Sequence, residues 1–156
     1  MNPQVSFRTR RALYVGVAAA TATLLLGLPS GAAAAVIVGV WLTEDGSSRV
    51  EIAANPASGS AAIYSGKVVW LKEPTRDGQA LRDANNSDAA LRERPIMGLE
   101  ILSGFKAAAG GGWAGGSIYS PRAGKGYPAE LAIGADGRLQ VKVKAGLVSK
   151  TVYWTR

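Results

Sequence analysis

Histidine and cysteine are both absent from the 156 residues, so the side chains that carry most nucleophilic and metal chemistry are missing. Serine and cysteine triads need a histidine base, and zinc sites are built mainly from histidine and cysteine. No phosphate-binding glycine loop is present either. Carboxylates are therefore the groups that remain for acid–base or metal chemistry, supplied by 11 aspartates and glutamates.

Two stretches hold carboxylates close together in the sequence. Glu44 and Asp45 are adjacent, so in a strand their side chains point to opposite faces and do not act together. The segment DANNSD, from Asp83 to Asp88, has a faint calcium-loop spacing, but its twelfth position is Arg94, where a bidentate glutamate is required. We expect these side chains to cap their own turns, and we predict no metal site, no cofactor and no catalysis.

Arg94 is the most informative charge, because it lies in the turn-forming segment RERP, residues 92–95. If this segment folds over a barrel mouth, Arg94 meets either an acidic side chain or the anionic head of a ligand. A buried arginine normally needs a fixed counter-charge, which favours an acidic partner such as Glu44, Asp45 or Glu100.

The N-terminal segment has the pattern of an export signal. A basic start with three arginines precedes a long uncharged, leucine-rich stretch, and a proline and a glycine then lead into the alanine run 32–35. We predict a signal peptide over residues 1–34, cleavage near 33–35, and one mature domain over 35–156. An uncleaved anchor is the alternative, because the uncharged stretch is long enough for a bilayer of about 30 Å.

This signal places the protein in the periplasm or outside the cell. The general secretory route is favoured, although TRRAL (Thr9 to Leu13) resembles a twin-arginine signal. Without cysteine there is no disulfide and no lipid-modified cysteine, so packing and backbone hydrogen bonds must hold the fold together. The mature part has 15 basic and 11 acidic side chains, a net charge of +4, and their even spread argues against nucleic acid as a partner.

Short runs with alternating apolar and polar residues, separated by turn residues, make up the mature chain. The eight runs are VIVGVW, RVEIA, AIYSGKVVWL, GLEILSGFK, WAGGSIY, AELAI, LQVKVKA and TVYWT. The link GADG suits a tight hairpin, and SPRAGKG can turn back in the same way. Short links join antiparallel neighbours, so we predict an all-β, eight-stranded, antiparallel up-and-down barrel whose interior is filled or holds one small ligand.

One polar segment, from Glu73 to Pro95, interrupts the series of strands. Ser87 is expected to cap a short helical turn, with Asp88 suited to its positive end and Pro95 ending it. The segment is either a lid or plug at one barrel end or a long solvated loop.

A tryptophan lies near each end of the mature chain. Gly39 and Trp41 at the start of the first strand, with Arg156 after the last, resemble the lipocalin signature, in which the arginine packs over the indole and closes one barrel end. A cation over a π face contributes roughly 0.5 to 2 kcal/mol. The resemblance implies structural roles in barrel closure for Gly39, Trp41 and Arg156, and alternation puts Trp154 on the strand face of Arg156.

Five motifs, in order along nearly the whole mature chain, resemble the bacterial domain of unknown function numbered 2147. They are GVWLTEDG, GKVVWL, DANNSDAALRERPIMGLEILSGF, WAGGSIYSPRAGKGYPAELAI and TVYWTR. The resemblance implies an exported, small, lipocalin-like barrel without an agreed biochemical activity. This chain has Ser120 and Gly126 where the family usually has aspartate and threonine, which leaves a polar or metal role of that loop unsupported.

These observations lead to three hypotheses. The first is an exported lipocalin-like protein, a monomer or weak dimer, that binds a small apolar or amphipathic molecule inside the barrel. The candidate wall and mouth residues are Tyr64, Val68, Trp70, Arg94, Leu102, Trp113 and Tyr119. The second is a cell-envelope interaction or structural protein with a filled core, whose mildly basic surface meets anionic polymers or lipid head groups. The third is a carboxylate-based hydrolase, which needs a paired-acid cleft.

Overall fold

The computed structural model describes residues 37–56 and 61–156. The predicted signal peptide and its cleavage site lie outside the described residues. Within the part of the chain that is described, no helix is long and apolar enough to cross a membrane.

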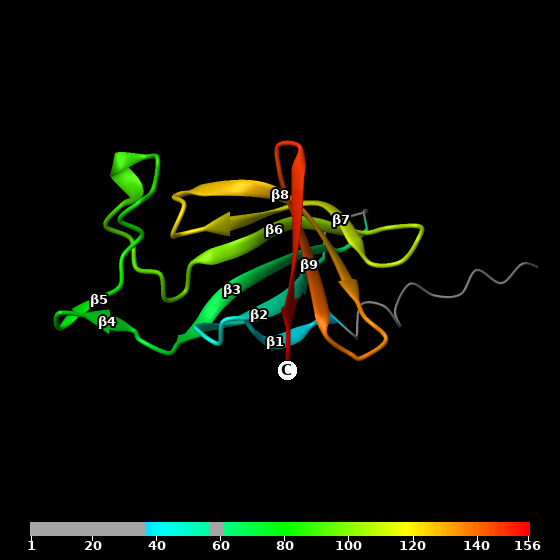
Figure 1. The fold of residues 1–156 in the computed structure, drawn as a ribbon, viewed down its shortest axis with the longest axis horizontal. Helices are drawn as coiled ribbons and strands as arrows, with labels where there is room; N and C mark the ends of the chain where they lie inside the picture. Colours follow the sequence, from blue (N-terminus) through cyan, green and yellow to red (C-terminus); the bar gives the residue numbers. More distant parts are fainter. Residues whose placement is uncertain (1–36, 57–60) are drawn as a thin grey trace, which may run out of the picture.

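Eight strands form one antiparallel sheet in which neighbours in space are also neighbours in strand order (Figure 1). They are β1 (Gly39–Leu42), β2 (Ser48–Asn55), β3 (Ile63–Leu71), β6 (Glu100–Ala107), β7 (Trp113–Ser120), β8 (Lys125–Ile133), β9 (Leu139–Ala145) and β10 (Val148–Trp154). The predicted all-β, eight-stranded antiparallel fold is confirmed. The sheet curls strongly, so that β9 and β10 cross the direction of β3 and β6 in Figure 1.

The first and last strands meet where the curled sheet closes on itself. Leu42 and Thr155 exchange two backbone hydrogen bonds, of 2.6 and 3.0 Å. Beside this bridge, the guanidinium carbon of Arg156 lies 4.7 Å from the ring centroid of Trp41, whose indole N–H donates to the carbonyl of Ile37. The predicted stacking of the arginine on the indole is therefore present, and it holds the two ends of the sheet together.

Two further residues complete this closure. Trp154 is buried, with 3% of its surface exposed, as expected for a side chain that faces the interior. Gly39 has a φ of 131°, a backbone conformation that L side chains rarely adopt, which explains a glycine two residues before the tryptophan.

The interior of the curled sheet holds one continuous cluster of apolar side chains. Its buried members are Ile37, Trp41, Val50, Ile52, Tyr64, Val68, Leu99, Ile101, Leu102, Phe105, Trp113, Ala129, Leu131, Leu139, Val141 and Trp154. Glycines allow close packing at two points. A Cβ at Gly116 would lie 2.5 Å from the ring of Phe105, and one at Gly66 would lie 3.0 Å from side-chain atoms of both Val50 and Leu102.

The alternation predicted for the third strand holds only for its first part. Tyr64 and Val68 are buried, but Trp70 is 39% exposed. The pairing with β2 shifts between Arg49 and Val50, so that Val69 is an extra residue and the alternation changes after it. Trp70 therefore lies on the exposed face with Arg49, whose guanidinium carbon is 5.3 Å from its ring centroid, and the prediction that Trp70 lines the barrel was wrong.

The polar insertion between β3 and β6 extends to one side of the sheet and contains a small hairpin and a helical turn (Figure 1). The hairpin pairs β4 (Thr75–Arg76) with β5 (Gln79–Ala80), and η1 (Ala89–Leu91) is a 3-10 turn. The predicted helical turn is confirmed, but its cap is Asp88, whose carboxylate accepts from the N–H of Ala90. Ser87 instead donates its backbone N–H to the carbonyl of Gly124, which keeps it outside the turn.

Candidate functional site

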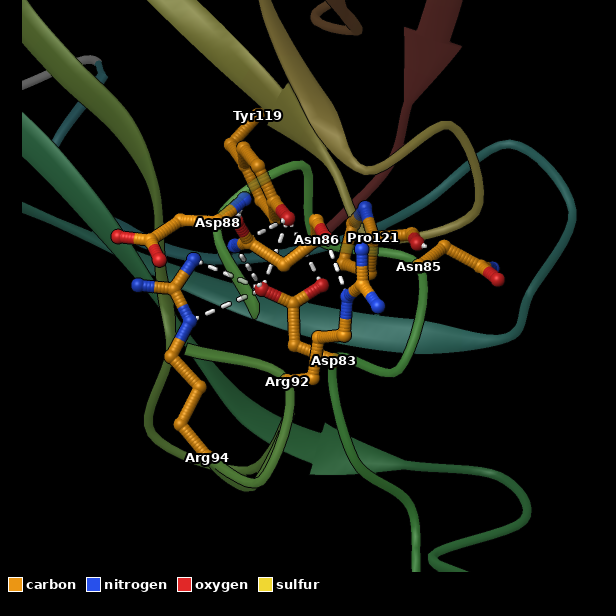
Figure 2. A network of polar contacts seen from close by, with 8 residues as sticks. All are labelled: Asp83, Asn85, Asn86, Asp88, Arg92, Arg94, Tyr119 and Pro121. Carbon is orange, nitrogen blue, oxygen red and sulfur yellow. Dashed lines mark hydrogen bonds and ion pairs between the residues drawn. The ribbon is translucent and has the colours of Figure 1, made fainter. Parts of the chain in front are cut away.

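A buried carboxylate organises the insertion. Asp83 is 0% exposed, and one of its oxygens accepts from Nε of Arg94 at 2.9 Å and pairs with Nη2 of the same guanidinium at 2.8 Å. The hydroxyl of Tyr119 lies 2.8 Å from both carboxylate oxygens, and the side-chain amide of Asn86 donates to Asp83 at 2.7 Å (Figure 2). Each of these contacts favours the charged form of the carboxylate. Asp83 is fully buried, so these contacts take the place of water.

The contacts shift the ionisation equilibria of Asp83, Tyr119 and Arg94. Burial raises the pKa of the Asp83 carboxyl, but hydrogen bonds from Asn86, Tyr119 and Arg94 outweigh it and hold that pKa below its usual value. Burial also raises the pKa of the Tyr119 phenol, and its hydrogen bond to the Asp83 carboxylate raises it further. Around neutral pH the site thus contains a carboxylate, a neutral phenol and a guanidinium, which describes a satisfied ion pair and not a carboxyl group poised for proton transfer.

Arg94 has the kind of partner that the sequence favoured, but a different residue supplies it. The expected candidates were Glu44, Asp45 and Glu100, and the structure places Asp83 there instead. Glu44 accepts from the backbone N–H of Tyr153, which ties it to another part of the sheet. The prediction missed Asp83 because it considered that residue only as part of a faint calcium loop, although Asp83 and Arg94 belong to the same insertion.

The insertion is fastened to the hairpin between β7 and β8. The side-chain amide of Asn85 donates to the carbonyls of Pro121 and Arg122 at 3.4 and 3.2 Å. At Gly124, whose φ is 66°, a Cβ would lie 1.6 Å from the carbonyl oxygen of Asn85. This contact is possible only for glycine, so the two segments are built to touch. The insertion is therefore an ordered structure held at one end of the sheet.

The candidate wall residues fall into three environments. Tyr64, Val68, Leu102 and Trp113 belong to the buried apolar cluster, and the rings of Tyr64 and Trp113 meet edge to face with centroids 5.9 Å apart. Tyr119 contacts the cluster with its ring and Asp83 with its hydroxyl. Arg94 is part of the polar network, and Trp70 lies on the exposed face.

Trp113 carries an unexplained polar atom. Its side chain is 3% exposed, and within the described residues its indole N–H has no hydrogen-bond acceptor. A buried N–H without an acceptor costs about 1 to 3 kcal/mol, and most such groups in native proteins find a partner. This donor therefore marks a point in the apolar interior where an acceptor atom would be favourable.

Hollows in the surface lie along strands β6 to β10. A groove of about 710 Å³ has walls that include Ser103, Ser117, Glu130 and Lys144, which alternate with the core residues. A second hollow of about 360 Å³ shares Glu130 with this groove, and its walls include Trp113 and Leu131 of the buried cluster. Within residues 37–56 and 61–156, no three acidic, histidine or cysteine side chains gather in a way that could hold a metal ion.

Comparison with known proteins agrees with this fold. The family described as "Uncharacterized protein conserved in bacteria (DUF2147)" matches residues 39–156. Protein HP1028 from the human pathogen Helicobacter pylori, described as belonging to the lipocalin family, has a similar solved structure with a TM-score of 0.61 and 24% sequence identity. That similarity covers 77% of this chain and 82% of the other, and it shows a common fold. No curated protein matches the chain.

The family match begins at the first residue of β1 and continues through Arg156, so it includes all eight strands, the insertion and the closing arginine. The chain therefore belongs to the bacterial family DUF2147, and its fold is lipocalin-like.

Proposed function

We propose that this protein binds a small, largely apolar molecule inside the curled sheet, and that the molecule carries one hydrogen-bond acceptor. The observation that supports this most directly is the buried indole N–H of Trp113, which has no acceptor within the described residues. A carbonyl, hydroxyl or carboxylate oxygen of a ligand would satisfy it. The lipocalin-like fold is compatible with this proposal, because an eight-stranded barrel either is filled by side chains or holds one small ligand.

The surroundings of Trp113 define the class of ligand. The neighbouring ring of Tyr64 is aromatic and the cross-strand neighbour Leu131 is apolar, so the body of the ligand must be largely apolar too. The ion pair of Asp83 and Arg94 already satisfies both charges, so an anionic ligand head is not needed to explain Arg94. On this proposal the protein is a binding protein of the periplasm or the cell exterior without catalytic activity.

Native mass spectrometry tests the proposal on protein purified from its own host, in the form that the cell produces. We expect an additional small mass that is released on denaturation. Replacing the indole with a phenyl ring in Trp113→Phe removes the N–H and should weaken retention of that molecule about fivefold, the value of one hydrogen bond of about 1 kcal/mol.

Trp70→Phe is the matched control, because Trp70 is an exposed tryptophan outside the cluster. It should leave the bound mass unchanged. A protein without a bound mass that also fails to bind apolar fluorescent probes contradicts the proposal.

A filled barrel that acts through its outer surface in the cell envelope is the second candidate. The tight packing at Gly66 and Gly116 favours it, because Val50, Leu102 and Phe105 occupy the space that a larger residue would take. Association with isolated envelope fractions that weakens at high salt supports this candidate, whereas a released ligand supports the first.

A further inference from the structure

The hairpin between β9 and β10 ends in an apolar turn that points into solvent. Leu147 is fully exposed, and Val148 beside it is 69% exposed. Gly146 has a φ of 64°, as the first central position of a two-residue hairpin turn requires. The second position, Leu147, accepts a polar residue equally well, so the turn itself does not require a leucine. The fold thus exposes apolar surface that it does not need for its own stability.

Positive charge surrounds this apolar turn. Lys142, Lys144 and Lys150 all lie within four residue pairs of the turn, and β9 and β10 contain no acidic residue. The carboxylate of Glu130 in β8 is the partner of Lys144. An apolar tip with ammonium groups behind it complements a surface that is anionic on the outside and apolar just beneath.

The shape of the molecule makes the tip accessible to such a surface. Figure 1 shows the β9–β10 hairpin projecting beyond β7 and β8 at the top of the view, away from the polar insertion at the left. The turn that joins β9 and β10 is the part of the sheet that reaches furthest in this direction.

We propose that the β9–β10 tip docks on an anionic lipid bilayer, with Leu147 and Val148 entering the headgroup region and the lysines contacting anionic headgroups. The lysine stems allow the ammonium groups to stay in the polar layer while the tip is inserted. This docking does not require a ligand in the barrel. It deepens the second candidate function by naming the surface and the partner.

Flotation with lipid vesicles tests the docking on protein purified from its own host. We expect binding to vesicles that contain phosphatidylglycerol, weak binding to pure phosphatidylcholine, and loss of binding as salt is raised. The double variant Leu147→Ser and Val148→Ser should bind the vesicles with an affinity that is lower by about tenfold or more, because two exposed apolar side chains are lost. Lys150→Glu should weaken binding about tenfold or more by adding repulsion. Lys72→Glu is the control, because Lys72 is an exposed lysine that directly follows β3 and belongs to neither strand of the docking hairpin.

A fluorescent reporter locates the contact. Because the chain has no cysteine, Leu147→Cys provides one attachment site for an environment-sensitive fluorophore. We expect its emission to shift to the blue when anionic vesicles are added. Leu91→Cys is the matched control, since Leu91 is a leucine that is 39% exposed in the distant insertion, and its label should not respond.

Three results would overturn the docking proposal. The first is a wild-type protein that fails to float with phosphatidylglycerol vesicles. The second is a serine double variant that floats as well as wild type, and the third is a label at position 147 that does not respond. Self-association that is lost in the double variant, without vesicle binding, would assign the tip to contact with a second copy of the chain. A negative vesicle result changes neither the mass spectrometry outcome, which tests the first candidate function, nor salt-dependent association with envelope fractions, which tests the second, so failure of this proposal is distinguishable from failure of either.

Discussion

The buried carboxylate of Asp83 and the partly exposed guanidinium of Arg94 form an ion pair, with Nε and Nη2 of Arg94 at 2.9 and 2.8 Å from the same oxygen of Asp83. Both residues come from the insertion, but the hydroxyl of Tyr119 ties the pair to β7. The pair thus links the internal structure of the insertion to its attachment on the sheet. Loss of one partner should therefore loosen both.

Arg94→Ala should lower the free energy of unfolding by about 3 kcal/mol, because it leaves a fully buried carboxylate without its charge partner. Urea denaturation at neutral pH measures this change. Arg82→Ala is the control, since the ion pair of Arg82 with Glu93 is exposed and should contribute less than about 1 kcal/mol. Equal effects of the two substitutions would show that the buried pair contributes no more than a surface pair.

Stability should fall in acid through Asp83. The pKa of Asp83 in the folded protein lies below the ordinary value of 3.8. The charged carboxylate therefore contributes fully to the free energy of unfolding above about pH 3.8, and this contribution is lost as pH falls through the lowered pKa. Urea denaturation of wild type and Asp83→Asn from pH 7 to pH 2 tests this. The difference between them should be constant near neutral pH and shrink in acid. A difference that does not change with pH would exclude the carboxylate as its source.

Tyr119→Phe should lower the free energy of unfolding by about 1 to 3 kcal/mol, because the phenyl ring retains the packing but removes the hydroxyl donor to Asp83, which keeps only its donors from Asn86 and Arg94. The raised pKa of Tyr119 means that wild type loses this contribution as pH rises through about 10 and above. The variant should lack that alkaline loss. Chemical denaturation between pH 8 and pH 11 separates the two proteins.

Gly124→Ala should detach the insertion from the β7–β8 hairpin, because the added Cβ would lie 1.6 Å from the carbonyl oxygen of Asn85. Hydrogen exchange should then increase at the backbone N–H groups of Asn86 and Ser87. Gly137→Ala is the control: its φ of 77° is equally unfavourable for alanine, but no atom lies within 4 Å of the added Cβ. Gly137→Ala should lower the free energy of unfolding by about 1 kcal/mol without changing hydrogen exchange in the insertion.

The polar insertion illustrates what local sequence signals can and cannot predict. The short helical turn was predicted, because capping and proline signals act over a few residues. The cap moved from Ser87 to Asp88, because a backbone hydrogen bond to Gly124 holds Ser87 and that contact spans a long stretch of sequence. The partner of Arg94 was missed for a related reason, since several acidic residues were equally plausible without knowledge of how the insertion folds back.

The sequence by itself determined the eight antiparallel strands, because period-two alternation and turn residues are local patterns. The stacking of Arg156 on Trp41 was expected only from the resemblance to the lipocalin signature, and the family from five motifs in order along the chain. Tertiary structure decided which side chains meet. The extra residue Val69 turns Trp70 outward, and the packing of the insertion against the β7–β8 hairpin brings Tyr119 to Asp83. The first depends on the register between two strands and the second on contacts between segments far apart in the sequence, and for that reason no single segment encodes them.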